Sequence, residues 1–154
     1  MKKILFVCYG NICRSPMAEA IMFHLLKEKR LEDRFYVESA STSKEEIGND
    51  IYYLAKKKLI EKGIHFAPRR ARQLRADDYD KFDYIIGMEM HNIYDIKEII
   101  GLDHNNKIAR LLDYTNAPRD INDPWITGLF EEAYNDIYEG CVAFLDYLLK
   151  ENND

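Results

Sequence analysis

The stretch that decides the fold is "KKILFVCYGNICRSPMAEAIMFHLLKEKR", residues 2–30. Residues 3–7 contain the unbroken apolar run "ILFV" (4–7), which is typical of a buried strand. After the run the stretch takes on helical periodicity, with Pro16 in the first turn and basic residues at the end. The turn between strand and helix contains Cys8, Gly10, Asn11 and Arg14. The sequence therefore predicts a strand–loop–helix unit whose loop carries a cysteine and an arginine.

The rest of the chain repeats this alternation of short apolar runs and longer helical patterns. Further strands are expected at 35–41, 82–88 and 107–114. Further helices are expected at 49–63, 91–101 and 129–150, with a loop at 115–128 and a frayed end at 151–154. Strands that alternate with helices favour an α/β fold, a parallel sheet of about four strands with helices on both faces. In such a three-layer sandwich, ligands bind outside the carboxyl ends of the strands.

Length and composition indicate one domain, residues 1–154, long enough to bury about two thirds of its surface. The 47% apolar and 32% charged content is ordinary for a soluble globular protein. No apolar run approaches the ~20 residues of a membrane span, and the first one breaks at Gly10 without a signal-peptide cleavage site. We therefore expect a cytoplasmic protein that does not bind membranes. The net charge of −5 argues against a general nucleic-acid binder.

One segment runs against the acidic balance of the chain. "PRRARQLR", residues 68–75, carries four arginines in eight positions. It is interpreted either as a solvated face or as a docking edge for an acidic or phosphorylated partner, and the sequence does not choose between them.

The chain has three cysteines, Cys8, Cys13 and Cys141. An odd number without a secretory signal does not suggest a disulfide framework. The spacing of Cys8 and Cys13 does not match a zinc knuckle, and no histidine forms a ligand pair with them, so no metal is expected. Cys141 lies in an apolar helical pattern and is expected in the core.

The loop after the first strand has the chemistry of an anion site. A loop that closes on a helix N-terminus directs backbone N–H groups and positive potential at one point, which suits a phosphate-sized oxyanion. Gly10 and Asn11 tolerate the positive φ that such a loop requires. A cysteine there is favoured as a thiolate, Arg14 can hold two phosphate oxygens, and Ser15 can donate to the sulfur. The C-x5-R spacing alone is weak; its placement between strand and helix is informative.

Three segments carry a family resemblance: "CYGNICRSPMAEA" (8–20), "FDYIIGM" (82–88) and "DPWITG" (123–128). They resemble the low-molecular-weight protein tyrosine phosphatases, in particular bacterial-type members, and the likeness covers essentially the whole chain. The resemblance implies a flavodoxin-like or Rossmann-like fold, with strand order 2-1-3-4 and about five flanking helices. It also implies hydrolysis of phosphotyrosine and small aryl phosphates through a phosphocysteine, with no metal or organic cofactor.

The resemblance assigns the catalytic roles. Cys8 would be the nucleophile, Arg14 with the loop amides would bind the phosphate, and Asp123 would be the general acid and base. The phosphate-binding loop would comprise Tyr9, Gly10, Asn11, Ile12, Cys13, Arg14 and Ser15. Asp123 follows the last strand, on the carboxyl side of the sheet where the cysteine loop lies. Taken alone, its Asp-Pro pair indicates a turn with a solvated aspartate.

Two further roles concern the rim of the site. Cys13 would either form a reversible disulfide with Cys8, which protects the nucleophile from over-oxidation, or be a passive loop residue. Tyr9 and Trp125 would line a slot for a flat phosphotyrosine ring. Animal members have two tyrosines after the Asp-Pro pair, whereas this chain has Trp125 and Ile126. Regulation through phosphorylation of that tyrosine pair is therefore not expected.

Three other functions compete with this one. A thiol-dependent arsenate reductase of the same fold needs further cysteines in 75–100, and this segment has none. A protein-arginine phosphatase carries a threonine where this chain has Ile12. A non-catalytic phosphate- or phosphopeptide-binding module would not need Asp123. For the phosphatase, the expected partner is a phosphotyrosine protein, and a bacterial tyrosine kinase is one option. Inorganic phosphate and vanadate are expected as inhibitors. The enzyme is expected to be a monomer.

Overall fold

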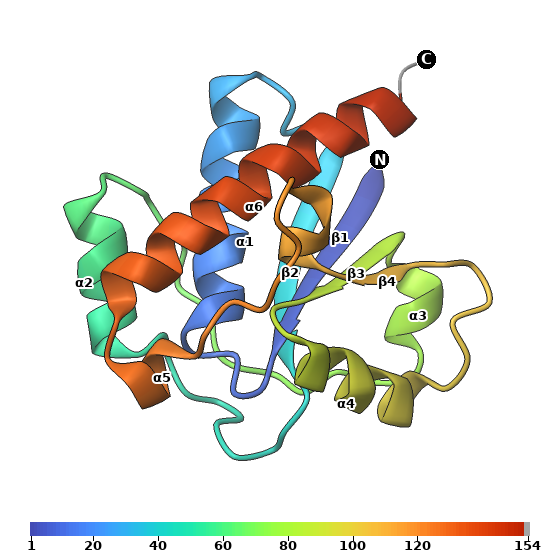
Figure 1. The fold of residues 1–154 in the computed structure, drawn as a ribbon, viewed down its shortest axis with the longest axis horizontal. Coiled ribbons are helices and arrows are strands. Elements are labelled where there is room, and N and C mark those ends of the chain that lie inside the picture. Colours follow the sequence, from blue (N-terminus) through green and yellow to red (C-terminus); the bar gives the residue numbers. More distant parts are fainter. Residues whose placement is uncertain (153–154) are drawn as a thin grey trace.

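The computed structural model describes residues 1–152 and contains one parallel four-stranded sheet of order β2-β1-β3-β4, as predicted. The strands are β1 (Lys2–Cys8), β2 (Phe35–Ser41), β3 (Tyr84–Gly87) and β4 (Ile108–Arg110). The helices are α1 (Arg14–Glu28), α2 (Tyr53–Glu61), α3 (Asp78–Lys81), α4 (Met90–Ile100), α5 (Pro124–Thr127), α6 (Phe130–Glu151) and the 3₁₀ helix η1 (Leu111–Tyr114). Figure 1 shows this arrangement, with α6 lying across α1 and the sheet.

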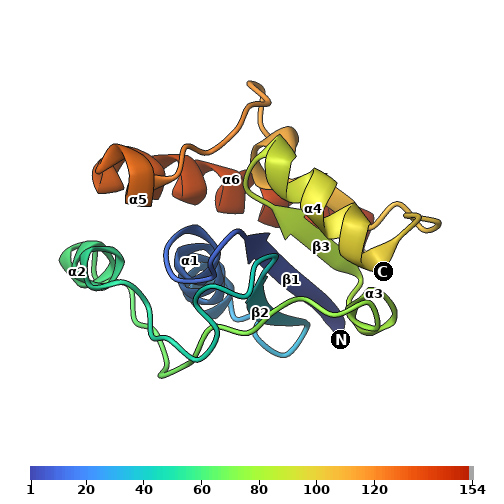
Figure 2. The same ribbon diagram turned by 90° about the horizontal axis from the view of Figure 1, so that it is seen from below.

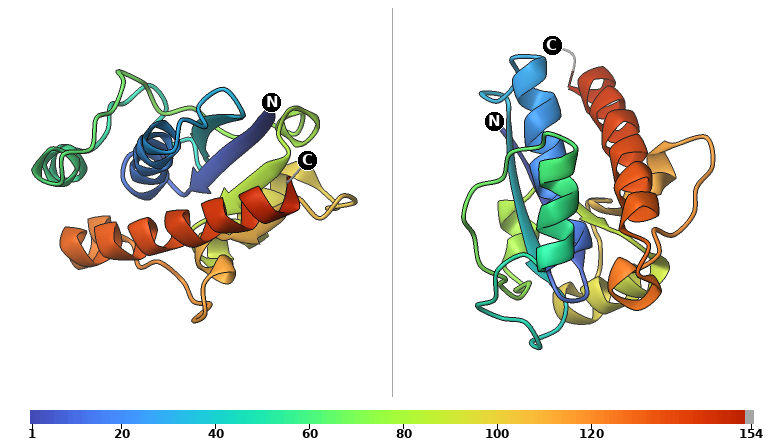
Figure 3. Two further views of the ribbon diagram at one scale, coloured as in Figure 1. Left: turned by 90° about the horizontal axis from the view of Figure 1, so that it is seen from above. Right: turned by 90° about the vertical axis from the view of Figure 1, so that its left-hand side faces the viewer.

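The unbroken apolar run of β1 is explained by helices on both faces of the sheet. Ile4 and Phe6 belong to the core cluster that includes α1 and α6, and the Phe6 ring meets Phe144 of α6 edge-on at 6.3 Å. Leu5 and Val7 point the other way, into the cluster formed with α3 and α4. Because successive strand residues face opposite sides, a strand covered on both sides shows no alternation. Figure 3 shows α6 running along the length of the molecule beside α1.

The prediction of a strand over 107–114 was wrong in its second half. Strand β4 ends at Arg110, where the Asp113 carboxylate accepts hydrogen bonds from the Arg110 backbone N–H and from its Nε, both at 2.9 Å. The chain then turns as η1, and Leu111 and Leu112 become fully buried beneath α6. The sharp turn is set by a local side-chain cap and by tertiary packing, so apolar content alone did not distinguish it from a strand.

Two helices of four residues each were not predicted: α3 follows the arginine-rich segment, where no element was assigned, and α5 lies within 115–128, which was expected as a loop. A single helical turn is too short to show periodicity. The end of the chain also differs from expectation. Glu151 belongs to α6 and accepts from the Tyr84 hydroxyl at 2.9 Å, while the carbonyl of Asn152 accepts from Arg34 at 3.0 Å. These two residues are not frayed, and 153–154 lie outside the described residues.

The topology collects several loops at one end of the sheet. Strand β1 pairs with β2 on one side and β3 on the other, so the strand order reverses at β1, which is where ligands bind in open parallel sheets. The loops that follow β1, β2 and β3, and the segment before α5, lie at this end, the lower one in Figure 1; Figure 2 views the molecule from there. Within residues 1–152, no helix is long and apolar enough to span a membrane.

Candidate active site

Cys8 is the last residue of β1, and its sulfur is surrounded by hydrogen-bond donors. The backbone N–H groups of Asn11 and Ser15 point at Sγ from 3.3 and 3.4 Å, and the Ser15 hydroxyl lies 3.0 Å from it. Asn11 has φ of +59°, in the left-handed region that asparagine tolerates better than most residues. This turn folds the loop back over the sulfur and aims the amides inward. The donors and the N-terminus of α1 together direct positive partial charge at the sulfur.

Asn11 holds the loop together from behind. Its side chain is fully buried; Nδ2 donates to the Ser15 hydroxyl at 2.8 Å, and Oδ1 accepts from the Arg72 backbone N–H at 3.2 Å. The Arg69 guanidinium donates both to this Oδ1 and, at 3.0 Å, to the Asn11 carbonyl. Asn11 and Ser15 therefore support the loop that would hold the phosphate and do not line its cavity.

The arginine-rich segment is neither a solvated face nor a free docking edge at two of its four arginines. Arg69 is half-buried against the cysteine loop, and Arg72 pairs with Asp78 at 3.0 Å and Glu38 at 3.3 Å. Arg69 binds Asn11 and Arg72 binds Glu38, and both partners lie more than thirty residues away in sequence. Only Asp78, in the short helix α3, is near its partner Arg72 along the chain. The interpretation as a solvated face was wrong at these two arginines, and docking of a partner by the exposed Arg70 and Arg75 stays a prediction.

Arg14, the first residue of α1, is an arginine with only 2% of its surface exposed. Its Nη1 donates to the Ile121 carbonyl at 2.8 Å and pairs with the Glu89 carboxylate, and its Nη2 lies 3.5 Å from Asp123 Oδ2. Burial acts to lower the pKa of Arg14, but the negative charges of Cys8, Asp123 and Glu89 raise it above its ordinary value. The guanidinium is thus a fixed positive charge beside the sulfur.

The two carboxylate oxygens of Asp123 have different contacts: one binds the backbone of α5 and the other faces Arg14. Oδ1 accepts from the Trp125 backbone N–H at 3.1 Å and so caps α5, with Pro124 in the first turn. Oδ2 faces Arg14. Asp120, three residues earlier, accepts instead from the Met90 backbone N–H at 2.9 Å and from Arg110 at 3.0 Å. The two aspartates of this loop therefore have different surroundings, and Asp123 alone of the pair lines the cysteine cavity.

A cavity of about 320 Å³ opens above the cysteine loop. Its floor includes Cys8 and Arg14, and Asp123 lies in its wall. Tyr9 and Trp125 also line it, and Trp125 is supported by an edge-on contact with Tyr52 at 4.6 Å. The structure thus brings a sulfur, a guanidinium, a carboxylate and two aromatic rings to one opening, although Asp123 is more than a hundred residues from the loop.

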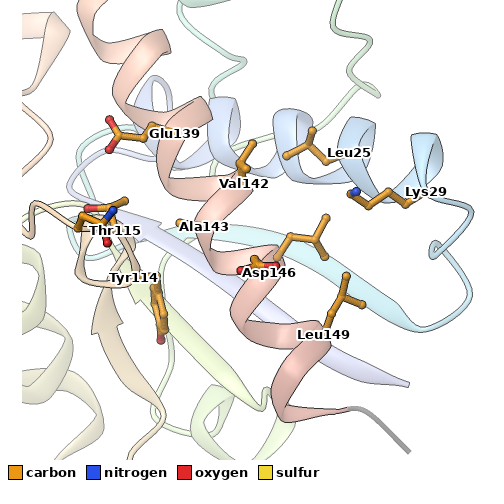
Figure 4. Close-up of a pocket in the computed structure, with 11 residues that line it drawn as sticks. Leu25, Lys29, Tyr114, Thr115, Glu139, Val142, Ala143, Asp146 and Leu149 are labelled. Carbon is orange, nitrogen blue, oxygen red and sulfur yellow. The ribbon is translucent and has the colours of Figure 1, made fainter.

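A larger cavity, about 480 Å³, lies elsewhere, between the end of α1, η1 and α6. Figure 4 shows Leu25 of α1, and Lys29 just after this helix, opposite Val142, Asp146 and Leu149 of α6. It contains no cysteine and no loop that converges backbone amides on one point. The smaller cavity above Cys8 is therefore the candidate active site.

Comparison with known proteins agrees with this geometry. The family model described as "Low molecular weight phosphotyrosine protein phosphatase" matches residues 3–154. The chain belongs to this family. A protein-tyrosine-phosphatase of Bacillus subtilis, YfkJ, is 42% identical over 98% of both chains, and one of Staphylococcus aureus, PtpA, is 35% identical over 99% of this chain and 97% of its own. The predicted family and enzyme class, a protein-tyrosine-phosphatase and hence a hydrolase, are confirmed.

Solved structures of the family have the same fold. The crystal structure of Bacillus subtilis YfkJ superposes with a TM-score of 0.95, covering 99% of this chain and 97% of its own. The Streptococcus pyogenes phosphatase SP-PTP gives 0.86 at 36% identity over 96% and 93%. A Drosophila arginine phosphatase gives 0.84 at 33% identity over 96% and 98%. The predicted Rossmann-like fold is thereby confirmed.

The two other cysteines of this phosphatase differ in position. Cys13 occupies the N-cap position of α1 without a side-chain capping hydrogen bond, and it lines the cavity; burial raises the pKa of its thiol, with Cys8 and Asp123 adding to the effect. It is therefore a neutral thiol beside Cys8. Cys141 is fully buried in α6, as predicted for a core residue. All three cysteines are free thiols, and no group of three or more potential metal ligands occurs within residues 1–152.

Three parts of the site escaped the sequence-based prediction: Glu89 and the Ile121 carbonyl, which hold Arg14, and Arg69, which holds Asn11. Glu89 lies two residues after the end of β3, so its place at the carboxyl edge of the sheet was a usable signal. A carbonyl leaves no trace in sequence, and Arg69 shows no motif that links it to the loop.

Proposed function

We propose that the protein removes phosphate from phosphotyrosine in proteins, and from small aryl phosphates, through a phosphocysteine intermediate. The observation that carries the proposal is the convergence of Cys8, Arg14 and Asp123 on one cavity. In the first step, the Cys8 thiolate attacks phosphorus in line with the phenolic oxygen. The S–P bond forms, the P–O bond to the ring breaks, and Asp123 gives a proton to the leaving oxygen.

In the second step, water attacks the phosphorus of phosphocysteine. Asp123, now a carboxylate, takes a proton from this water while the S–P bond breaks. Inorganic phosphate leaves, and the Cys8 thiolate and the Asp123 proton are restored. The carboxyl group thus acts as acid and then as base, and each role is worth about 10²- to 10⁴-fold in rate.

Arg14 and the loop amides stabilise the equatorial phosphate oxygens while charge redistributes. Phosphate in this cradle lies against the loop of residues 9–15, where Tyr9, Gly10, Ile12, Cys13 and Arg14 line the cavity and Asn11 and Ser15 hold the loop in shape. Free phosphate and vanadate are expected to occupy the same cradle and inhibit the enzyme. These roles need no metal or organic cofactor, since fixed positive charge comes from the protein itself.

Tyr9 and Trp125 give the pocket its depth. A tyrosine ring between them carries its phosphate to the loop, whereas a phosphoserine side chain is too short to reach the sulfur from the rim. Aromatic pairs in such offset or edge-on contacts contribute about 0.5–1.5 kcal/mol beyond the area they bury. The substrate class is therefore phosphotyrosine in a protein, with an autophosphorylated tyrosine kinase as one option. A cytoplasmic, monomeric enzyme fits this reading and stays a prediction.

Phosphoarginine is the second candidate substrate, because one structural neighbour is a Drosophila arginine phosphatase. Ile12, at the position of the loop threonine of such enzymes, weighs against it. The deciding experiment measures phosphate release from three peptides that carry phosphotyrosine, phosphoserine or phosphoarginine, with wild type and Cys8→Ser side by side. We expect release from phosphotyrosine alone, and none with Cys8→Ser. Preference for phosphoarginine would overturn the substrate class, and vanadate binding without any release would make the cradle a recognition module.

A further inference from the structure

Two carboxylates at the mouth of the catalytic cavity have no part in the proposed reaction. Glu45 and Glu46 belong to the loop that follows β2, and both line the cavity that contains Cys8. Glu46 lies directly against the cysteine loop, since a Cβ added to Gly10 would meet its Cγ at 3.5 Å. Glu45 lies beside Tyr9, and its hydrogen-bonding contact with that hydroxyl raises the pKa of Tyr9. The acidic side of the mouth is therefore in contact with the pocket that takes the ring.

These two carboxylates are not neutralised by the protein. Within residues 1–152, no lysine, arginine or histidine forms an ion pair with either of them; Glu46 accepts only from the amide of Asn49, at 2.6 Å. Lys44 precedes Glu45 but is exposed and does not line the cavity. Arg14, the cation of the cavity, is already paired with Glu89 and Asp123. Glu45 and Glu46 thus leave an uncompensated negative charge at the rim.

Two other residues that line the cavity are apolar and exposed. Trp125 and Ile126 line the cavity and expose 55% and 80% of their surface. A peptide whose phosphotyrosine enters the cavity has to cross its rim. The side chains next to the phosphotyrosine then lie over Glu45 and Glu46 or over Trp125 and Ile126. Complementary charge at such a rim acts mainly on encounter rate and on partner choice.

We propose that Glu45 and Glu46 select phosphotyrosine segments that carry a lysine or arginine within about three residues of the phosphotyrosine. The inference rests on the proposed function and adds the charge class of its substrate. Exposed charge pairs are each worth a factor of about two to five. With two carboxylates that attract lysine and repel glutamate, exchanging one flanking lysine for glutamate lowers kcat/KM about tenfold at low salt. Screening reduces this ratio at high salt, because the Debye length is then only ~3 Å.

The test uses variants of one phosphotyrosine peptide. At each flanking position, from −3 to −1 and from +1 to +3, the peptide is made in three forms that carry lysine, alanine or glutamate there. The quantity measured is the lysine-to-glutamate ratio of kcat/KM, at low salt and at about 1 M salt. Wild type is compared with Glu45→Gln/Glu46→Gln, with the reversed-charge variant Glu45→Lys/Glu46→Lys, and with Glu32→Gln/Asp33→Asn. The last pair removes the same charge before β2, at the other end of the sheet.

We expect the ratio to fall to about one in the glutamine variant, to invert in the lysine variant and to persist in the control pair. A ratio near one in wild type, or a ratio that persists in the glutamine variant, overturns the inference. Hydrolysis of the alanine peptide reports separately on the proposed function. If that peptide is not turned over, the same peptides are titrated against Cys8→Ser, where the charge preference must appear in Kd or the inference fails.

Discussion

Asp123→Asn separates the proposed catalytic role of this residue from its structural one. Asparagine caps a helix as well as aspartate does, so the Oδ1 contact with the Trp125 N–H is kept. The variant loses only the 3.5 Å charge contact with Arg14, which retains Glu89 and the Ile121 carbonyl. Partly exposed pairs of this kind contribute up to about 1 kcal/mol, so the folded state should persist. The amide cannot donate a catalytic proton, and kcat should fall about 10²- to 10⁴-fold.

The assay compares two aryl phosphates with different leaving groups. Nitrophenolate leaves with little help from an acid, whereas phenolate needs the proton, so the loss in kcat should be clearly larger for phenyl phosphate. Vanadate binding, measured by titration, should be unchanged or tighter, because a negative charge near the anion has been removed. Asp120→Asn is the matched control: it lies in the same loop but accepts from Met90 and Arg110, away from the cavity.

Three results would refute this reasoning. An equal loss for both leaving groups would mean that Asp123 does not protonate the leaving oxygen. A loss of vanadate binding in parallel with kcat would mean that the substitution had disturbed the phosphate loop. Unchanged turnover in Asp123→Asn would remove this residue from the mechanism altogether.

Three further predictions concern the scaffold around the site. Gly140→Ala places a Cβ 2.6 Å from Leu111 Cγ. Because such overpacking costs about 1–3 kcal/mol against a helix-propensity gain of about 1 kcal/mol, the variant should be less stable and its urea midpoint should fall. An unchanged or higher midpoint would contradict this prediction. Arg69→Met removes the charged donors to Asn11, and kcat/KM for an aryl phosphate should drop about ten- to a hundredfold; an unchanged value would show that the loop holds its shape without them. Two lysines near the end of α2 lower the pKa of Glu131 to about 2, so its stabilisation is present above pH 4.5 and is lost as pH falls toward 2. Glu131→Gln should therefore flatten the dependence of Tm on pH in that window, and an unaltered profile would exclude the contribution.

The parts of the fold that sequence could predict are those set by local pattern. The apolar run of β1 and the proline and basic ends of α1 are signals within a few residues, and both elements were found where expected. The 3₁₀ helix η1 was missed because its course depends on packing beneath α6, where Gly140 leaves room for Leu111. Apolar content is the same for a buried strand and a buried turn, so only the tertiary contact decides between them.

The site shows the same division. Cys8 and Arg14 are six residues apart, and their spacing with Asn11 between them is readable in the chain. Asp123 could be selected among 27 acidic residues only through the family resemblance. Arg69 was misjudged because its partner lies 58 residues away, and half-burial of a guanidinium has no signature in composition. Residues that act through long-range contacts become visible only when the fold brings them together.

The surroundings of Arg14 show how the site is prepared before substrate arrives. A guanidinium has five N–H donors, and its Nη1 directs both of its hydrogens away from the cavity, to Glu89 and to the Ile121 carbonyl. In the proposed mechanism, Nη2 and Nε bind phosphate oxygens, with Asp123 as the neighbour of Nη2. The charged arginine is thereby buried at 2% exposure and oriented during folding. Because neither desolvation nor side-chain ordering then remains to be done on binding, the donors can act at full strength on the charge that develops in the transition state.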